Sequence, residues 1–319
     1  MPLRTWAPRE ASTTDGQPLI PRCRRRCVTR AHRAALAALL IGTVACARAD
    51  REPARPPDVE FVPSEVEVVD TMLAMAALTS DDLVYDLGSG DGRILIAAAK
   101  RFGARGVGID IDPVRVDESR HNADTAGVAR LVEFREEDFF HTDLRPATVV
   151  MLYLLPELNV RLRPRLLAEL RPGARVISHE FDMGDWSPDS SSRAVFSRIH
   201  MWTIPAAVAG EWRVSATIDS VDREYAMELE QTFQQLSGSV VAVERTAVPR
   251  PRADRPLDAP TGRQMPIAST AVRGDSVVLG FFDMAPLRFA GRAHGDSLGG
   301  RILRADGTVA GSWRAARIP

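Results

Sequence analysis

Hydrophobic and polar positions follow two different patterns along this chain. Between residues 58 and 206, short apolar runs alternate with segments that carry apolar residues at helical spacing. The expected helices are 66–78, 93–102, 113–127 and 158–170, and the expected strands are 83–87, 106–109, 132–135, 148–154 and 175–178. Regular alternation of strands and helices predicts a parallel sheet with helices on both of its faces.

The second pattern begins near residue 207 and consists of strand-like runs separated by turns. The runs are 211–218, 226–236, 239–243, 276–282, 288–292 and 311–317. Turn sequences with a central glycine or an Asp-Gly pair occur at 273–275, 294–296 and 305–307. We therefore predict a small antiparallel β domain, a meander or a barrel. A stretch rich in proline and arginine, 249–264, is expected to be a loop.

The first 57 residues match neither pattern. A basic stretch, 22–33, precedes an uninterrupted apolar run, 34–45, and Ala47-Arg48-Ala49 follows it. This order is typical of a secretory signal, and the run is short for a membrane span. We predict export or membrane association through this segment, with a helix of a cytoplasmic protein as the alternative. The true start codon and lipidation of Cys46 stay open.

These patterns divide the chain into three parts. They are a signal-like segment with a proline-rich linker (1–57), an α/β domain (58–206) and a β-rich domain (207–319). Nine arginines and two acidic residues lie in 1–49, so the remainder keeps 32 of the 41 basic and 40 of the 42 acidic residues, a net charge of −8. A body this acidic has no general attraction for phosphate backbones, so we expect no nucleic-acid partner.

All three cysteines precede residue 50, so the body of the chain has neither a disulfide framework nor a cysteine-based metal site. His179 and Glu180 form a polar pair after the last predicted strand of the sheet. No third ligand is spaced with them, so we expect no metal site there.

The segment after the first predicted strand carries the strongest chemical signal. The strand runs into an acidic residue, then into a loop with glycine at every second position, then into a helix. Glycines permit tight turning and close approach of a ligand, and a helix amino terminus favours negative charge such as a carboxylate. The residues expected to bind a cofactor here are Asp86, Gly88, Ser89, Gly90 and Gly92.

The spacing of these glycines distinguishes two classes of cofactor. A dinucleotide-binding loop has the pattern G-x-G-x-x-G, whereas this loop reads G-x-G-x-G with an acid two residues before it. A pyrophosphate would be repelled by Asp86 and Asp91, and the cationic S-adenosylmethionine would not. The loop therefore favours S-adenosylmethionine over a dinucleotide.

Two further acids follow the next two strands. Asp110 ends the second strand, eighteen residues after Gly92, where a carboxylate can accept hydrogen bonds from both ribose hydroxyls. Asp138 follows the third strand and is expected to accept from the adenine amino group, with Phe139 or Ile111 against the ring.

Four stretches carry a resemblance to a known family: VYDLGSGDGRI, GVGID, EFREEDF and VVMLYLLPELNVRLRPRLLAELRPGARVISHEFDMGDW. They resemble class I S-adenosylmethionine-dependent methyltransferases. More narrowly, they are similar to the lysine methyltransferases that act on the ATP synthase c-subunit and the adenine nucleotide translocase, and to bacterial relatives of these enzymes. The resemblance covers roughly residues 60–186 and includes Phe61-Val62-Pro63-Ser64. It implies a Rossmann-like seven-stranded sheet and methylation of a protein lysine.

The acceptor side is less defined by sequence. After the fourth strand the chain reads Leu152-Tyr153-Leu154-Leu155-Pro156-Glu157, without the Asn/Asp-Pro-Pro-Tyr/Phe motif of enzymes that methylate base or amide nitrogens. Tyr153 and Glu157 are the candidate catalytic residues, placed to orient or desolvate an amine. They fit equally well as a core residue and a helix cap. A small-molecule methyltransferase and a non-catalytic exported module remain alternatives, and the acceptor and oligomeric state stay open.

Overall fold

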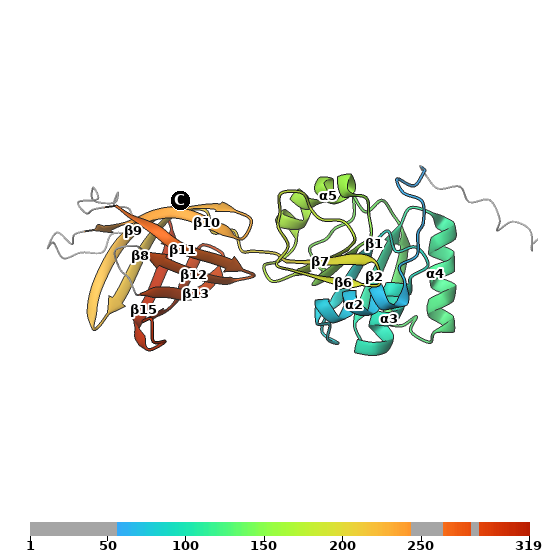
Figure 1. Ribbon diagram of the computed structural model, residues 1–319, viewed down its shortest axis with the longest axis horizontal. Coiled ribbons are helices and arrows are strands. Elements are labelled where there is room, and N and C mark those ends of the chain that lie inside the picture. Colours follow the sequence, from blue (N-terminus) through green and yellow to red (C-terminus); the bar gives the residue numbers. More distant parts are fainter. Residues whose placement is uncertain (1–55, 244–263, 282–286) are drawn as a thin grey trace, which may run out of the picture. The chain divides into compact units, whose positions relative to one another are not determined.

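The computed structural model describes residues 56–243, 264–281 and 287–319, which form a mixed α/β domain followed by an all-β domain (Figure 1). The elements of the first domain are α2 (Val66–Ala76), β1 (Leu83–Leu87), α3 (Arg93–Phe102), β2 (Arg105–Asp110), α4 (Pro113–Thr125), β3 (Val132–Glu136), β4 (Val149–Leu152), α5 (Pro156–Glu169), β5 (Arg175–His179), β6 (Ser190–Ala194) and β7 (Ser197–Thr203).

Seven strands form one sheet in the order β3-β2-β1-β4-β5-β7-β6. The first five strands are parallel, and β7 runs antiparallel to both β5 and β6. Alternate strand residues enter two separate cores: Val84 packs with residues of α2, α3 and α4, whereas Tyr85 and Leu87 pack with residues of α5. The predicted parallel α/β sheet with helices on both faces is therefore confirmed for five of the seven strands, and the whole sheet is mixed.

The resemblance implied seven strands, but the hydrophobic pattern did not locate the last two strands of this sheet. β6 reads SSSRA and buries only Ala194, because it lies at the edge of the sheet and pairs with one neighbour. In β7 the buried residues Ile199 and Trp202 are three apart, which breaks the alternation expected for a strand. Neither segment therefore has the period-two pattern that marks a strand in a sequence.

The second domain is a closed barrel of eight antiparallel strands. They are β8 (Gly210–Ile218), β9 (Val221–Thr232), β10 (Gln235–Val243), β11 (Met265–Arg273), β12 (Ser276–Phe281), β13 (Arg288–His294), β14 (Ser297–Leu303) and β15 (Val309–Arg317). Their inward residues, including Trp212, Phe289 and Trp313, form one core. The predicted antiparallel domain is thus confirmed and is specifically a closed barrel.

The strand predictions in the barrel need three corrections. The run 226–236 is a hairpin, because Phe233 adopts a left-handed conformation (φ 55°) and turns the chain between β9 and β10. β14 was missed because it contains Gly299-Gly300, and a side chain at Gly300 would meet the Ala290 carbonyl oxygen at 2.1 Å. Strand β11 was also missed. The predicted turns at Gly274, Gly295 and Gly307 connect strands as expected.

Two predicted segments lie wholly or mostly outside the described residues: the signal-like segment before residue 56 and the proline-rich stretch 249–264, of which only Gln264 is described. Among the helices that the structure describes, none has the length and apolar character to cross a membrane.

A buried polar cluster fixes the amino-terminal edge of the sheet. Asp82 precedes β1 and accepts hydrogen bonds from the Thr148 hydroxyl at 2.6 Å and the Thr79 amide at 2.9 Å. It also forms an ion pair with Arg175 at the start of β5. Burial opposes ionisation of Asp82, but these hydrogen bonds and Arg175 outweigh it, and the pKa of the carboxyl is lowered. The starts of β1, β4 and β5 are thus held level.

We expect Asp82→Asn to lower the free energy of unfolding at pH 7 by about 1–3 kcal/mol, because a buried ion pair and its hydrogen bonds are disrupted. Since the folded-state pKa is lowered, the stabilisation is present above the unfolded value of about 3.9 and is lost as the pH falls through the folded value. Urea unfolding at pH 7 and pH 3.5 measures this. Asp81→Asn, at an exposed neighbouring site, is the control. Equal effects of the two substitutions would contradict the prediction.

Candidate active site

The glycine loop lies at the carboxyl edge of the sheet, between the end of β1 and the start of α3. Gly88, Gly90 and Gly92 all have positive φ angles, of 82°, 51° and 80°. A side chain at Gly90 would lie 2.1 Å from the Phe61 ring, and one at Gly88 would lie 3.2 Å from Leu154. The glycines are therefore required both by the backbone conformation and by close contacts from two other segments.

Asp110 holds this loop in place. One oxygen of its carboxylate accepts a hydrogen bond from the Gly90 amide at 2.9 Å, and the other accepts from the Asp112 amide at 3.0 Å. Burial raises the pKa of Asp110, and these backbone hydrogen bonds oppose the rise. Each carboxylate oxygen keeps a further lone pair, so the predicted contact with ribose hydroxyls is compatible with this arrangement.

Asp86 is the most unusual acid of the site. It lies on β1 with 2% of its surface exposed, and its Oδ2 has no hydrogen-bond partner among the residues described. Burial, and then the charges of Asp110 and Asp91, raise the pKa of Asp86 well above its usual value. The hydroxyl of Ser89, also buried, lacks a partner within the same residues. Buried polar atoms are normally paired, so these two indicate a polar ligand group.

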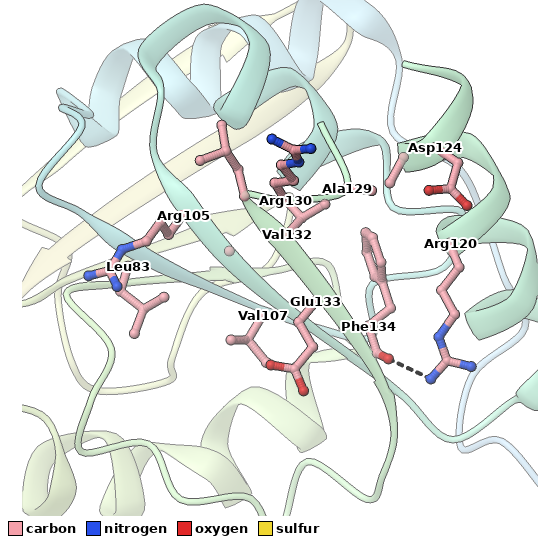
Figure 2. Close-up of a pocket in the computed structure, with 13 residues that line it drawn as sticks. Leu83, Arg105, Val107, Arg120, Asp124, Ala129, Arg130, Val132, Glu133 and Phe134 are labelled. Atoms are coloured by element: carbon pink, nitrogen blue, oxygen red, sulfur yellow. Dashed lines mark hydrogen bonds between the residues drawn. The ribbon is translucent and has the colours of Figure 1, made fainter. Parts of the chain in front are cut away.

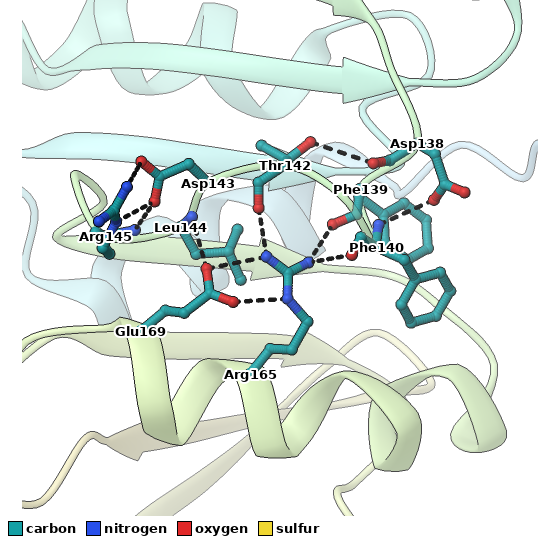
Figure 3. A network of polar contacts seen from close by, with 9 residues as sticks. All are labelled: Asp138, Phe139, Phe140, Thr142, Asp143, Leu144, Arg145, Arg165 and Glu169. Carbon is teal, nitrogen blue, oxygen red and sulfur yellow. Dashed lines mark hydrogen bonds and ion pairs between the residues drawn. The ribbon is translucent and has the colours of Figure 1, made fainter.

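The segment after β3 is fixed by a network centred on Arg165 of α5 (Figure 3). Its guanidinium donates to the carbonyl oxygens of Phe139 (3.0 Å) and Phe140 (2.6 Å) and pairs with Glu169 at 2.7 Å. No sequence motif indicated this role for Arg165.

This network determines where the predicted adenine-binding residues lie. Asp138 accepts from the Phe140 amide at 2.9 Å and so closes the turn. The Phe139 ring is 9% exposed and packs in the core on the α5 face, whereas Ile111, directly after β2, is half-buried. Phe139 thus contributes to the core of the sheet.

Tyr153, one of the predicted catalytic residues, follows β4 and stacks on His179 at the end of β5. Their ring centroids are 3.8 Å apart and the planes differ by 28°. The Ser64 hydroxyl is 2.9 Å from Nδ1 of His179, and both residues are buried. Burial raises the pKa of Tyr153 and lowers the pKa of His179. The other candidate, Glu157, is exposed in the first turn of α5.

Two further residues that the sequence did not single out position this cluster. Arg93 donates to the Ser64 carbonyl oxygen at 2.8 Å and pairs with Asp91 of the glycine loop at 2.6 Å. Asn159, fully buried in α5, donates to the carbonyl oxygen of Phe181 at 3.3 Å and so holds the segment after His179. The sequence could have indicated Arg93 only by its place directly after the glycine loop.

A separate hollow lies along β3, the edge strand of the sheet (Figure 2). Its lining includes Arg105, Arg120, Arg130 and Glu133, and it contains none of the glycine-loop residues. Among the described residues, no three His, Cys, Asp or Glu side chains are grouped to hold a metal ion. The candidate site is therefore the carboxyl edge of the sheet, where β1, β4 and β5 end level, with Leu87 beside Leu152 and Leu152 beside Ser178.

Comparison with known proteins places this edge within a recognised domain. Residues 86–190 match the ANTKMT methyltransferase domain. A protein-lysine N-methyltransferase of Saccharolobus islandicus is 44% identical over 133 residues, which are 41% of this chain and 83% of that protein. The mouse lysine N-methyltransferase of the ATP synthase c-subunit is 36% identical over 41% of this chain, and the aligned part spans 53% of that enzyme.

A solved structure is also similar to part of this chain. The crystal structure of an RNA methyltransferase from Salinibacter ruber in complex with S-adenosyl-L-homocysteine is 54% identical, covers 46% of this chain and 96% of that one, and has a TM-score of 0.45.

We expect Asp86→Asn to stabilise the ligand-free protein at pH 7 by about 1–3 kcal/mol, because a buried carboxyl without a partner is replaced by a neutral group. The folded-state pKa is raised, so ionisation destabilises the fold above the unfolded value of about 3.9, and the gain should disappear as the pH falls below about 4. Thermal and urea unfolding measure it. Asp91→Asn, which removes a partner of Arg93, should instead destabilise. A loss of stability in Asp86→Asn would contradict the prediction.

Proposed function

The chain belongs to the protein-lysine N-methyltransferase family that its archaeal relative represents, and we propose that it transfers a methyl group from S-adenosylmethionine to the side-chain nitrogen of a protein lysine. The observation that carries this proposal is the buried, unpartnered Asp86 beside a glycine loop that is fixed by Asp110. The aligned region covers 41% of the chain. The methyltransferase activity is therefore proposed for the whole protein from the similarity of this part.

The residues at the carboxyl edge suit this cofactor. The free oxygen of Asp86 can pair with a protonated amino group, and the amino terminus of α3 favours a carboxylate, so the two ends of a methionine moiety have matching partners. Asp110 can accept from ribose hydroxyls. Asp138 and half-buried Ile111, at the ends of β3 and β2, are proposed to contact the adenine.

When bound, S-adenosylmethionine supplies an electrophilic methyl group on a sulfonium. The protein then has to align an acceptor nitrogen with that carbon and keep the nitrogen neutral. Tyr153 and His179 line the carboxyl edge next to Leu154, which contacts the glycine loop. These two side chains are proposed to bind the acceptor amine and exclude water from it.

A protein acceptor is favoured over a small molecule by the relatives that carry lysine methyltransferase activity in their names. Export or membrane association through residues 1–57 remains a prediction from the sequence.

The function is tested by incubating the full-length purified chain with S-adenosylmethionine tritiated in its methyl group and the total protein of a bacterial host. We expect label that precipitates with acid, resists nuclease and elutes as methyl-lysine after hydrolysis. Label that disappears on nuclease treatment would show a nucleic-acid acceptor, and label confined to small molecules would show the small-molecule alternative. Absence of both transfer and cofactor binding would refute every enzymatic assignment.

We expect Asp110→Ala to weaken binding of S-adenosylmethionine at least tenfold in calorimetry. Each hydrogen bond to a carboxylate contributes about 1.5–3 kcal/mol, and about 1.4 kcal/mol corresponds to a factor of ten. Asp112→Ala is the matched control, because Asp112 lies two residues away and caps α4 through the Val114 amide at 2.8 Å. Unchanged affinity in a folded Asp110 variant would show that the ribose lies elsewhere.

A further inference from the structure

We propose that Nε2 of His179 accepts the proton that the lysine ammonium must lose before methyl transfer, and that Ser64 and Tyr153 fix the imidazole ring for this step. The inference rests on the proposed function and adds a catalytic residue to it. Four observations on the His179 cluster support the assignment.

The first observation is position. His179 is the last residue of β5, and Tyr153 directly follows β4, the strand beside it. Both residues therefore leave the sheet at the carboxyl edge where the glycine loop begins. Leu154, the neighbour of Tyr153, packs against Gly88 of that loop. The imidazole thus lies on the strands that border the expected methyl donor.

The second observation is that the ring is held from two sides. Tyr153 stacks on it at 3.8 Å between centroids, and the Ser64 hydroxyl lies 2.9 Å from Nδ1. The backbone of Ser64 is in turn fixed by Arg93, which pairs with Asp91. A chain of contacts therefore connects the position of the imidazole to the position of the glycine loop.

The third observation is the other ring nitrogen. His179 is 3% exposed, and its Nε2 has no hydrogen-bond partner among the residues described. When Nδ1 carries the hydrogen and donates it to the Ser64 oxygen, Nε2 holds a free lone pair. A buried imidazole with one nitrogen engaged and the other free has the arrangement required of a general base.

The fourth observation is electrostatic. Burial lowers the pKa of His179 below its usual value of 6.5, and the nearby Glu180 opposes this without reversing it. Tyr153, from the segment after β4, has a raised pKa and is neutral at pH 7, and Arg93 reaches the cluster only through Ser64. The ring is therefore neutral at pH 7 and able to take up a proton.

In the proposed step an N–H bond of the ammonium breaks and the proton binds Nε2, which leaves the electron pair on the acceptor nitrogen. That pair forms the bond to the methyl carbon as the carbon–sulfur bond breaks and its electrons remain on sulfur. The proton on Nε2 passes to water when the product leaves. No redox partner or metal is needed for this balance.

The test is His179→Asn, which keeps a short amide near Ser64 and removes Nε2. With the tritiated donor and the host protein mixture used above, we expect the rate at pH 7 to fall about 100-fold, the scale of general-base catalysis. Affinity for S-adenosylmethionine should stay within twofold. The defect should narrow toward pH 9.5, where solution deprotonates more of the lysine, whereas a purely structural defect would persist at every pH.

The chain offers a matched control in His200. Its Nδ1 also lies close to a serine hydroxyl, that of Ser191 at 2.8 Å, and burial lowers its pKa too. His200→Asn should leave the rate at pH 7 within twofold. Ser64→Ala should lose about tenfold with partial recovery at high pH. Tyr153→Phe, which keeps the stacked ring and removes the phenol hydroxyl, should lose less activity than His179→Asn.

Two results would overturn the assignment. One is a rate for His179→Asn within threefold of wild type at pH 7. The other is a loss in Tyr153→Phe as large as that in His179→Asn, which would make the phenol the base. Nitrogen NMR of labelled histidine provides a readout independent of turnover. It should show His179 neutral at pH 7 with hydrogen on Nδ1, and hydrogen on Nε2 would refute the proposal even if methyl transfer itself were absent.

Discussion

Two carboxyl groups at the carboxyl edge of the sheet, buried Asp86 on β1 and half-buried Asp110 at the end of β2, determine how the residues around them are arranged. Burial raises the pKa of both carboxyls, and the charges of Asp110 and Asp91 raise the pKa of Asp86 further. The Gly90 amide donates a hydrogen bond to Asp110, and this contact requires the loop to turn tightly toward β2. Glycines with positive φ angles make that turn possible, so the loop's composition follows from the placement of the two acids.

A chain of contacts connects the glycine loop to the His179 cluster. Asp91, which lies within the glycine loop, is paired with Arg93, and the guanidinium of Arg93 also reaches the backbone of Ser64. Ser64 then contacts His179 on β5. At the opposite edge of the sheet, Asp82 holds the starts of β1, β4 and β5 level. The ends of these strands therefore meet at one edge, and residues distant in the sequence come into contact there.

The sequence predicted those features that depend on adjacent residues, and it missed those that depend on contacts between distant segments. The bounds of β1 and α3 agree with the predicted ranges, because an apolar run, a glycine turn and an amphipathic helix are properties of adjacent residues. The acids at strand ends were found for the same reason. Strand β6 could not be found from the sequence, because it lies at the edge of the sheet, pairs with one neighbouring strand and consists mostly of polar residues. The contact between Ser64 and His179 joins residues 115 positions apart, so only the fold reveals it.

The division of charge across the site follows from the chemistry proposed for it. The cofactor side is acidic, with Asp86 buried and Asp110 half-buried there, and suits a ligand that carries an ammonium and a sulfonium. The acceptor side brings together a hydroxyl, a phenol and a neutral imidazole. A carboxylate in place of the imidazole would favour the ammonium form of lysine and so oppose the loss of its proton. A neutral base binds the amine without that penalty, and the positive donor beside it disfavours a second positive charge. The carboxyls of Asp86 and Asp110 and the neutral imidazole of His179 thus serve opposite requirements within one edge of the sheet.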